Sequence, residues 1–485
     1  MPHGPVSRSL RLPCCRRLAT TSFIVLTTLV GALVPMTANA SASRSTTTST
    51  PGSKTASSSV AVPTTSPYYS LLVAGMSPTV GYGQTVNGCA VQPKTTCVKA
   101  QLAGAMLRGA LFDYADLDGA NLSGATLALA SFGYASMAGA NLNDTTLTGV
   151  TLDYVYAPGL SLVGSSLHLG AIDNGDLKGA DLRHMNANFG AVVGSDLDHA
   201  DLEGANLSDT DFNGDNLSDA NLSGADLANG DLTGSNLAGA NLSGVDFCNP
   251  VMPNGKVRNP RKGTCAGQTP PAQSKGAPIS IDSSNIFYPA IHALLTGHQV
   301  RAGTVVNGCR IQAYTKCPGA KLAHADLQGA FLAYSTLDGG DLSGANLFLG
   351  SMAFAKASDV NLKGIALGAT SAVNATMVGT AFDKAELNLT NLVGADLRGA
   401  SFTGVDGRVA SFSGADLRGD NFTGANLAEA SFAGANLTGA DLAGANLSET
   451  TLLGATMTAA DTTGATFCDT IMPDGTIKNP TLGKC

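Results

Sequence analysis

An apolar side chain recurs at every fifth position through two long stretches of the chain. Between Leu102 and Phe247, 28 of the 30 positions taken in steps of five hold Leu, Phe, Met, Ile or Val, and between Leu322 and Phe467 the same is true of 26 of 30. Ala commonly stands two residues before the apolar position, Asn or Asp one before it, and Gly two after it. This period fits neither regular element, because on a helix successive apolar residues would step about 140° around the axis and on a straight strand they would alternate between faces.

The pattern therefore predicts a backbone that bends once in every repeat. Such bends gather the apolar side chains into one narrow interior, with Gly, Asn and Asp supplying the turns and Ala fitting beside the larger residue. The expected structure is an all-β solenoid whose backbone hydrogen bonds run between successive coils. Aromatic residues replace the usual Gly at intervals of twenty, which indicates four repeats per coil; they are Tyr114, Tyr134, Tyr154, Tyr334 and Phe354.

The whole repeat array with its caps occurs twice in the chain, and equivalent positions are 220 residues apart. The tetrapeptide from Val86 to Cys89 recurs from Val306 to Cys309, and Met252–Gly255 recurs as Met472–Gly475 with one change. A flexible linker between the units would let the two arrays move independently. The predicted organisation is a signal peptide at 1–40, a Ser/Thr/Pro-rich disordered spacer at 41–66, a first solenoid with Cys caps at 67–265 (repeats about 100–248), a linker at 266–284, and a second solenoid with Cys caps at 285–485 (repeats about 320–468).

The segment at 1–40 has the features of an export signal. Four arginines precede an apolar run from Phe23 to Met36, and Ala38–Ala40 offers a small-residue cleavage site. We expect a secreted or cell-envelope location. The alternative is an uncleaved membrane anchor, because no charge interrupts residues 18–40.

Eight cysteines remain after the signal, and an even number in an exported chain favours disulfides. Local pairing within each cap is expected because a rigid array separates the other combinations, and each bridge would contribute roughly 2 to 4 kcal/mol. The competing interpretation is a metal site, but no histidine stands at ligand spacing among these cysteines. The predicted bridges are Cys89–Cys97, Cys248–Cys265, Cys309–Cys317 and Cys468–Cys485.

The recurring A(D/N)LxG signature, as in Ala120-Asn121-Leu122-Ser123-Gly124, resembles the pentapeptide-repeat proteins. That resemblance implies a right-handed quadrilateral β-helix, here in two tandem copies and usually noncatalytic. It also implies that the apolar repeat centre and the small residue before it point inward. The segments from Asn87 to Cys97 and from Cys248 to Cys265 look like the caps of exported members.

Motifs that would support catalysis do not occur in the sequence. It holds no phosphate loop, GxSxG elbow or HExxH pair, and its acids occupy outward repeat positions. His168, His184 and His199 are not spaced by multiples of twenty, so they would fall in different columns. We therefore predict no enzyme activity, no catalytic residue, no cofactor and no metal site.

Two surface features suggest a partner surface. From Gly194 to Phe247 the chain carries eleven acids and no Lys or Arg, and aromatic residues occupy outward positions early in the first array. The acids are either a solvated face or a site for a cationic partner or Ca²⁺. The aromatic patch is either a contact surface or is packed under the N-terminal segment or against the second unit. The candidate surface residues are Tyr114, Tyr134, Tyr154, Tyr156, Asp196, Asp198, Asp201, Asp211, Asp226 and Asp231.

Two binding functions compete. The first is an exported scaffold or binding module that presents a rigid acidic surface to a protein or glycan at the cell envelope, with a homodimer also possible. The second is a DNA mimic that binds gyrase and confers quinolone resistance, as some pentapeptide-repeat proteins do; export would separate the chain from that cytosolic target. Without residues 1–40 the chain carries 24 Lys and Arg against 36 Asp and Glu, a net charge of −12 that would repel nucleic acid.

Overall fold

The structure is a computed structural model. It describes residues 59–62, 80, 83–248, 250–256, 258, 279–282, 300 and 303–478.

Each array is a solenoid whose coil takes four pentapeptides. Every bridge in the first array joins positions twenty apart in parallel, as in Gln101 with Asn121, and the same spacing holds throughout the second array. Each pentapeptide contributes one bridge and one turn, so four of them complete a coil, as the aromatic spacing predicts. The ladders run from Thr96 to Val251 and from Lys316 to Ile471. In one place the bridges lengthen into the parallel strands β4 (Ala171–Asp173) and β5 (Ala191–Val193).

The interior of each coil is filled by the residues that define the five-residue period. Leu122 and the neighbouring Ala120 and Ala125 are all buried, and the two arrays hold separate cores. In the second array Phe382, Phe402 and Phe422 stack with ring centroids 4.6 Å apart. The one-coil spacing thus places identical side chains in contact, and no helix occurs among the described residues.

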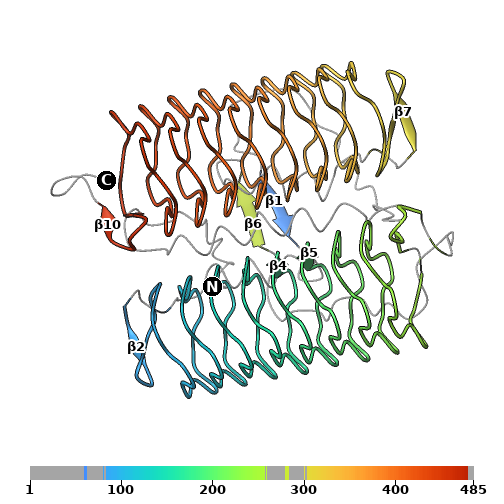
Figure 1. The fold of residues 1–485 in the computed structure, drawn as a ribbon, viewed down its shortest axis with the longest axis vertical. Coiled ribbons are helices and arrows are strands. Elements are labelled where there is room, and N and C mark those ends of the chain that lie inside the picture. Colours follow the sequence, from blue (N-terminus) through green and yellow to red (C-terminus); the bar gives the residue numbers. More distant parts are fainter. Residues whose placement is uncertain are drawn as a thin grey trace, which may run out of the picture.

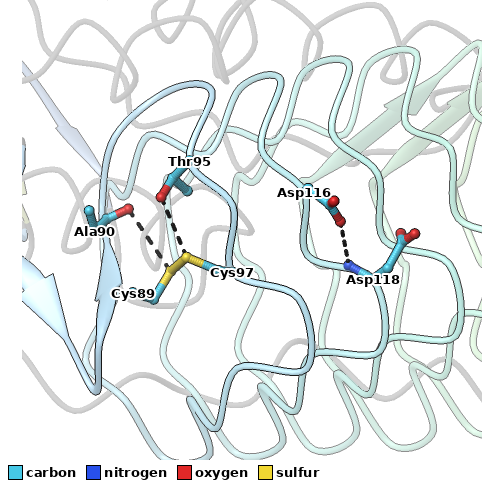
Figure 2. The surroundings of a disulfide bond; sticks show 6 residues. All are labelled: Cys89, Ala90, Thr95, Cys97, Asp116 and Asp118. Atoms are coloured by element: carbon cyan, nitrogen blue, oxygen red, sulfur yellow. Dashed lines mark hydrogen bonds between the residues drawn. A yellow bond between two sulfur atoms is a disulfide. The ribbon is translucent and has the colours of Figure 1, made fainter.

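Short antiparallel strand pairs close the starts of both arrays. Before the first array, β2 (Thr85–Val86) pairs with β3 (Cys89–Ala90), and before the second, β7 (Thr304–Val306) pairs with β8 (Cys309–Ile311). The predicted bridges Cys89–Cys97 and Cys309–Cys317 are both formed. Figure 2 shows the first of them, with the Thr95 hydroxyl 3.5 Å from the Cys97 sulfur.

The far ends of the arrays are closed in another way. The Arg258 guanidinium lies 3.8 Å from the centre of the Phe247 ring, and Lys478 lies 3.5 Å from that of Phe467, the equivalent pair of the second array. At the end of the second array, β9 (Thr470–Ile471) pairs with β10 (Ile477–Lys478). Cys248 and Cys468 are both disulfide-bonded, whereas Cys265 and Cys485 lie outside the described residues.

The two arrays lie side by side and run in opposite directions (Figure 1). The Lys94 ammonium at the start of the first array donates to the Pro473 carbonyl at 3.0 Å, and the Tyr314 hydroxyl at the start of the second donates to the Pro253 carbonyl at 2.9 Å. The two contacts are equivalent, because the duplication sets Lys94 against Tyr314 and Pro253 against Pro473. The arrays therefore contact each other at both ends in this structure, and a pseudo-two-fold axis relates them.

A strand pairing outside the arrays has the same symmetry. β1 (Ser59–Val62) pairs antiparallel with β6 (Ile279–Asp282), and the register joins Ser59 to Asp282 and Val62 to Ile279. The duplication makes β1 and β6 equivalent segments, so the pairing is self-complementary. Both strands lie in segments predicted as spacer and linker, and their β-branched residues favour strand formation there.

Candidate functional site

One side of each coil carries side chains unlike those of the other sides, and these two sides meet between the arrays. We call each of them a docking face. In the first array it consists of residues 111, 113 and 114 and every twentieth residue before and after them; in the second array it consists of residues 331, 333 and 334 and every twentieth residue before and after them.

A column of stacked aromatic rings stands on the first half of each docking face. Tyr114, Tyr134 and Tyr154 stack with ring centroids 4.8 Å apart and nearly parallel planes. The equivalent column in the second array contains Tyr314, Tyr334 and Phe354. The tyrosines of the first column adopt the left-handed backbone conformation that usually holds Gly in this repeat, with φ of 55° to 57°. Because that conformation is unfavourable for a bulky residue, packing of the rings must compensate for it.

A column of glycines on the second half of each face receives the opposite aromatic column. A Cβ atom on Gly434 would lie 2.6 Å from Cζ of Tyr134, and one on Gly214 would lie 2.6 Å from Cζ of Phe354. Gly434 and Gly214 are equivalent positions, and so are Tyr134 and Phe354. The match is therefore reciprocal: large residues in the first half of one face fill the hollows in the second half of the other.

The middle of the interface contains both apolar and polar contacts. Ala171, Ala191, Val193, Val373 and Val393 form a cluster between the arrays. The Asn391 amide donates to Oδ2 of Asp173 at 3.1 Å, and the Asn374 amide donates to Oδ1 of Asn174 at 2.8 Å.

The docking face of the first array also carries five carboxylates, which we call the interface acids. Four are buried and Asp113 is half-buried, and within the described residues none of them forms a salt bridge. Among the described residues, Oδ1 of Asp153 and Oδ1 of Asp173 have no hydrogen-bond partner. The interface acids are Asp113, Asp153, Asp173, Asp211 and Asp231.

Burial without a counter-charge favours the neutral form of these groups. Desolvation raises the pKa of Asp113 and of Asp231 from 3.8 to about 6, and that of Asp173 to about 7. Desolvation also raises the pKa of Asp153 and of Asp211 well above the usual value, and neighbouring carboxylates raise both further. Burial between the arrays therefore favours the protonated form of these acids.

A small cavity lies between the arrays beside two of the interface acids. Asp113, Asp153, Ser131 and Thr151 line it from the first array. Oδ1 of Asp113 accepts hydrogen bonds from the Ser131 hydroxyl and from the Gly133 backbone N–H. From the second array the cavity is lined by Ser413, Ser431, Ala433, Thr451 and Ile471.

The residues predicted to form one partner surface lie in two different places: some are packed between the arrays, and the others lie off the docking face. Tyr114, Tyr134 and Tyr154 lie between the arrays, which is the alternative of packing against the second unit, while Tyr156 is 53% exposed on another side. Asp211 and Asp231 are buried among the interface acids rather than on an open acidic surface. Their positions are outward with respect to their own coil, and the second array covers them. Asp196, Asp198, Asp201 and Asp226 lie off the docking face.

Two of the acids that lie off the docking face, Asp196 and Asp201, lie near basic side chains of the preceding coil. The Lys178 ammonium lies 3.0 Å from Oδ2 of Asp196, and the Arg183 guanidinium lies 3.8 Å from Oδ2 of Asp201. Both bases stand in the preceding coil, before the stretch without Lys or Arg. Arg183 pairs more closely with Asp181 of its own coil, at 2.7 Å, so Lys178 is the base that chiefly offsets one of these acids.

One histidine lies among acids. His199 Nδ1 is 3.0 Å from Oδ2 of Asp198, and these two residues and Asp219 offer ligand atoms within 4.8 Å of one another. His199 and Asp219 are exposed, and exposed acids gather in this way without an ion. His168 instead contacts Oδ1 of Asn188 at 2.7 Å.

Sequence reasoning offered packing of the aromatic residues against the second unit as an alternative, but it missed the glycine columns that receive them. The signal for these columns in the sequence was their spacing. Gly394, Gly414, Gly434 and Gly454 recur at every twentieth position, in the same column as the aromatic residues Tyr334 and Phe354. Glycine is the ordinary residue at that position of the repeat, so its presence there drew no attention.

Comparison with known proteins identifies the repeat. The family model described as "Pentapeptide repeats (8 copies)" matches several segments that together cover more than half of the chain. No curated protein matched the chain. The matched segments are residues 96–133, 176–214, 216–249, 317–349, 325–364, 367–404, 385–424, 410–448 and 435–472.

Solved structures similar to the chain carry the same family description or belong to a resistance protein. HetL, a pentapeptide repeat protein involved in heterocyst differentiation regulation from Nostoc sp. strain PCC 7120, is 20% identical over 79% of this chain and 92% of its own, with a TM-score of 0.13. A pentapeptide repeat protein from the Arabidopsis thaliana thylakoid lumen is 29% identical over 22% of this chain and 64% of its own, with a TM-score of 0.12. QnrB1, a plasmid-mediated fluoroquinolone resistance protein, is 19% identical over 31% of this chain and 85% of its own, with a TM-score of 0.16.

Within the residues that the structure describes, we find no helix with the length and apolar character needed to cross a bilayer.

Because the TM-scores of these structures are low, the family assignment rests on the match of the family model to the repeats. Because the family model matches more than half of the sequence, and each coil is built from four such repeats, the chain belongs to the pentapeptide repeat family.

Proposed function

We propose that this protein is an exported, noncatalytic scaffold that presents a rigid, partly acidic surface to a protein or glycan partner at the cell envelope. The observation that carries the proposal is the reciprocal packing of aromatic residues on glycines. It joins the two arrays into one body and covers their aromatic columns, so the sides available to a partner are mostly polar, with Met106 and Tyr156 among the exposed apolar side chains.

The polar sides are preorganised by hydrogen bonds between coils. The Asn216 amide donates to Oδ1 of Asp196 at 3.0 Å, and the Asn221 amide donates to Oδ1 of Asp201 at 2.9 Å. The Ser218 hydroxyl holds Oδ1 of Asp198 at 2.7 Å. Carboxylates fixed in this way lose little conformational freedom on binding, which favours a cationic or hydroxyl-rich partner.

We also infer that each array is a right-handed quadrilateral β-helix. The coil of four pentapeptides with one turn in each supports this geometry. Export rests on the sequence alone, because residues 1–40 lie outside the described residues. An uncleaved signal would anchor the same scaffold to a membrane.

Cell fractionation together with a binding assay tests the proposal. The mature chain, immobilised, should retain a protein or glycan from an envelope extract, and the triple variant Asp196→Asn, Asp198→Asn, Asp201→Asn should retain less. Asp396→Asn with Asp416→Asn, which removes two acids from the second array, is the control. Equal retention by all three proteins, or a cytosolic location, would contradict the proposal.

Two further assays separate the alternatives. Inhibition of gyrase supercoiling at low protein concentration would favour the DNA-mimicking function instead. Hydrolysis of a broad-range substrate that one point mutation abolishes would show an enzyme.

A further inference from the structure

The two docking faces are equivalent in position but not in charge. All five interface acids belong to the first array. The equivalent positions of the second array hold no acid; they are Ala333, Val373, Val393, Ser431 and Thr451. Aromatic and glycine columns occur on both faces, although the two aromatic columns are shifted by one coil: Tyr154 corresponds to Asn374, and Tyr314 corresponds to Lys94.

The cavity shows which positions confront one another. Asp113 and Asp153 face it from the first array, while Ser431 and Thr451 face it from the second. Ser431 and Thr451 are the equivalents of Asp211 and Asp231. If two first arrays packed by the same pseudo-two-fold relation, each of the two equivalent cavities would therefore contain four carboxylates.

Such a pairing would be strongly unfavourable. Carboxylates that share a water-poor site repel one another, and each already loses hydration on burial. In the observed pairing, the second array instead offers hydroxyl and amide groups, as in the hydrogen bond from Asn391 to Asp173.

We propose that the interface acids act as a pairing code: they restrict the docking face of the first array to a partner face without buried acids, which is that of the second array, and they prevent first arrays of two chains from pairing. Much of the shape of the faces is shared by the two arrays, because Gly214 and Gly434, like Tyr134 and Phe354, are equivalent positions. The charge difference selects the pairing of a first array with a second array.

The test introduces acids into the docking face of the second array and uses the full mature chain. Ser431→Asp with Thr451→Asp recreates in one cavity the charge of a pairing between two first arrays, and Ser431→Asn with Thr451→Asn adds nearly the same volume without charge. In small-angle X-ray scattering at neutral pH, the Asn variant should keep the radius of gyration of the wild type. The Asp variant should show a larger radius and faster proteolysis between the arrays.

A rescue variant guards against simple misfolding. Adding Asp113→Asn and Asp153→Asn to the Asp variant returns the cavity to two carboxylates and should restore the wild-type radius. If the Asp variant docks as well as the Asn variant, the code does not exist. If both variants separate, or if the rescue fails, fit rather than charge decides the pairing and the proposal is wrong.

Discussion

Gly434 offers a direct test of how the arrays are held together, because a matching glycine on an open side of the coil is available as a control. Gly434 and Gly439 both adopt left-handed conformations, with φ of +65° and +69°. Both donate their N–H to a carbonyl of the next coil at 2.9 Å. A Cβ on Gly439 would meet nothing within 4 Å, whereas one on Gly434 would lie 2.6 Å from Cζ and Oη of Tyr134.

The expected difference between the two Ala variants follows from these contacts. The backbone cost of Ala at positive φ, roughly 1 to 2 kcal/mol, is common to both and cancels. Tyr134 cannot easily move aside, because it is stacked 4.8 Å from Tyr114 on one side and 4.8 Å from Tyr154 on the other. Overpacking of this kind typically costs about 1 to 3 kcal/mol. At about 1.4 kcal/mol per factor of ten, Gly434→Ala should weaken docking roughly 5- to 140-fold relative to Gly439→Ala.

Near-ultraviolet circular dichroism is a suitable assay, since the chain has no Trp and ordered tyrosine columns contribute strongly to the signal. Gly434→Ala should lose this signal at a lower temperature than Gly439→Ala and should show a larger radius of gyration in scattering. Equal melting and equal dimensions for the two variants would refute the reasoning that the aromatic and glycine columns hold the arrays together.

Three other outcomes can be measured. Burial raises the pKa of Asp173 from 3.8 to about 7, so the contribution of this group to the stability of the docked state is fully present below pH 3.8 and is lost as the pH rises through 7. The arrays should therefore separate at a higher temperature at pH 4.5 than at pH 8. Asp173→Asn should reduce that difference. Asp420 occupies an inward alanine position and burial raises its pKa to about 8, so Asp420→Ala should stabilise the fold at pH 7 by about 1 to 3 kcal/mol, whereas Asp416→Ala on the surface should change stability little. Leu207→Ala should cost about 2 to 5 kcal/mol in thermal unfolding and the volume-conserving Leu207→Met less than about 1.5 kcal/mol; an unchanged melting temperature for the Ala variant would contradict a Leu-filled interior.

The sequence was sufficient for the structure inside one array and insufficient for the contact between arrays. Leu207 is buried because a rule that repeats at every fifth position determines its direction, and such a rule can be read locally. The contact of Tyr134 with Gly434 joins residues of different arrays, and it depends on two faces matching in shape. Glycine at position 434 already satisfies the turn, so its second role leaves no separate trace in the pattern.

Charge neighbours were hidden for a related reason. Lys178 and Asp196 stand in successive coils and face each other, but a linear window along the chain assigns them to different regions. Asp211 lies outward from its own coil, and only the position of the other array shows that it is buried.

The antiparallel arrangement gives the molecule two ends of the same construction. At one end the start of the first array meets the end of the second, where Lys94 reaches Pro473, and at the other end Tyr314 reaches Pro253. A binding partner that recognised features common to both ends, such as the turns at Pro253 and Pro473, would find them at the opposite end as well, although Lys94 stands where the other end has Tyr314. One chain would then be bivalent and could bridge two such partners at a fixed separation, with the avidity that a stiff spacer provides.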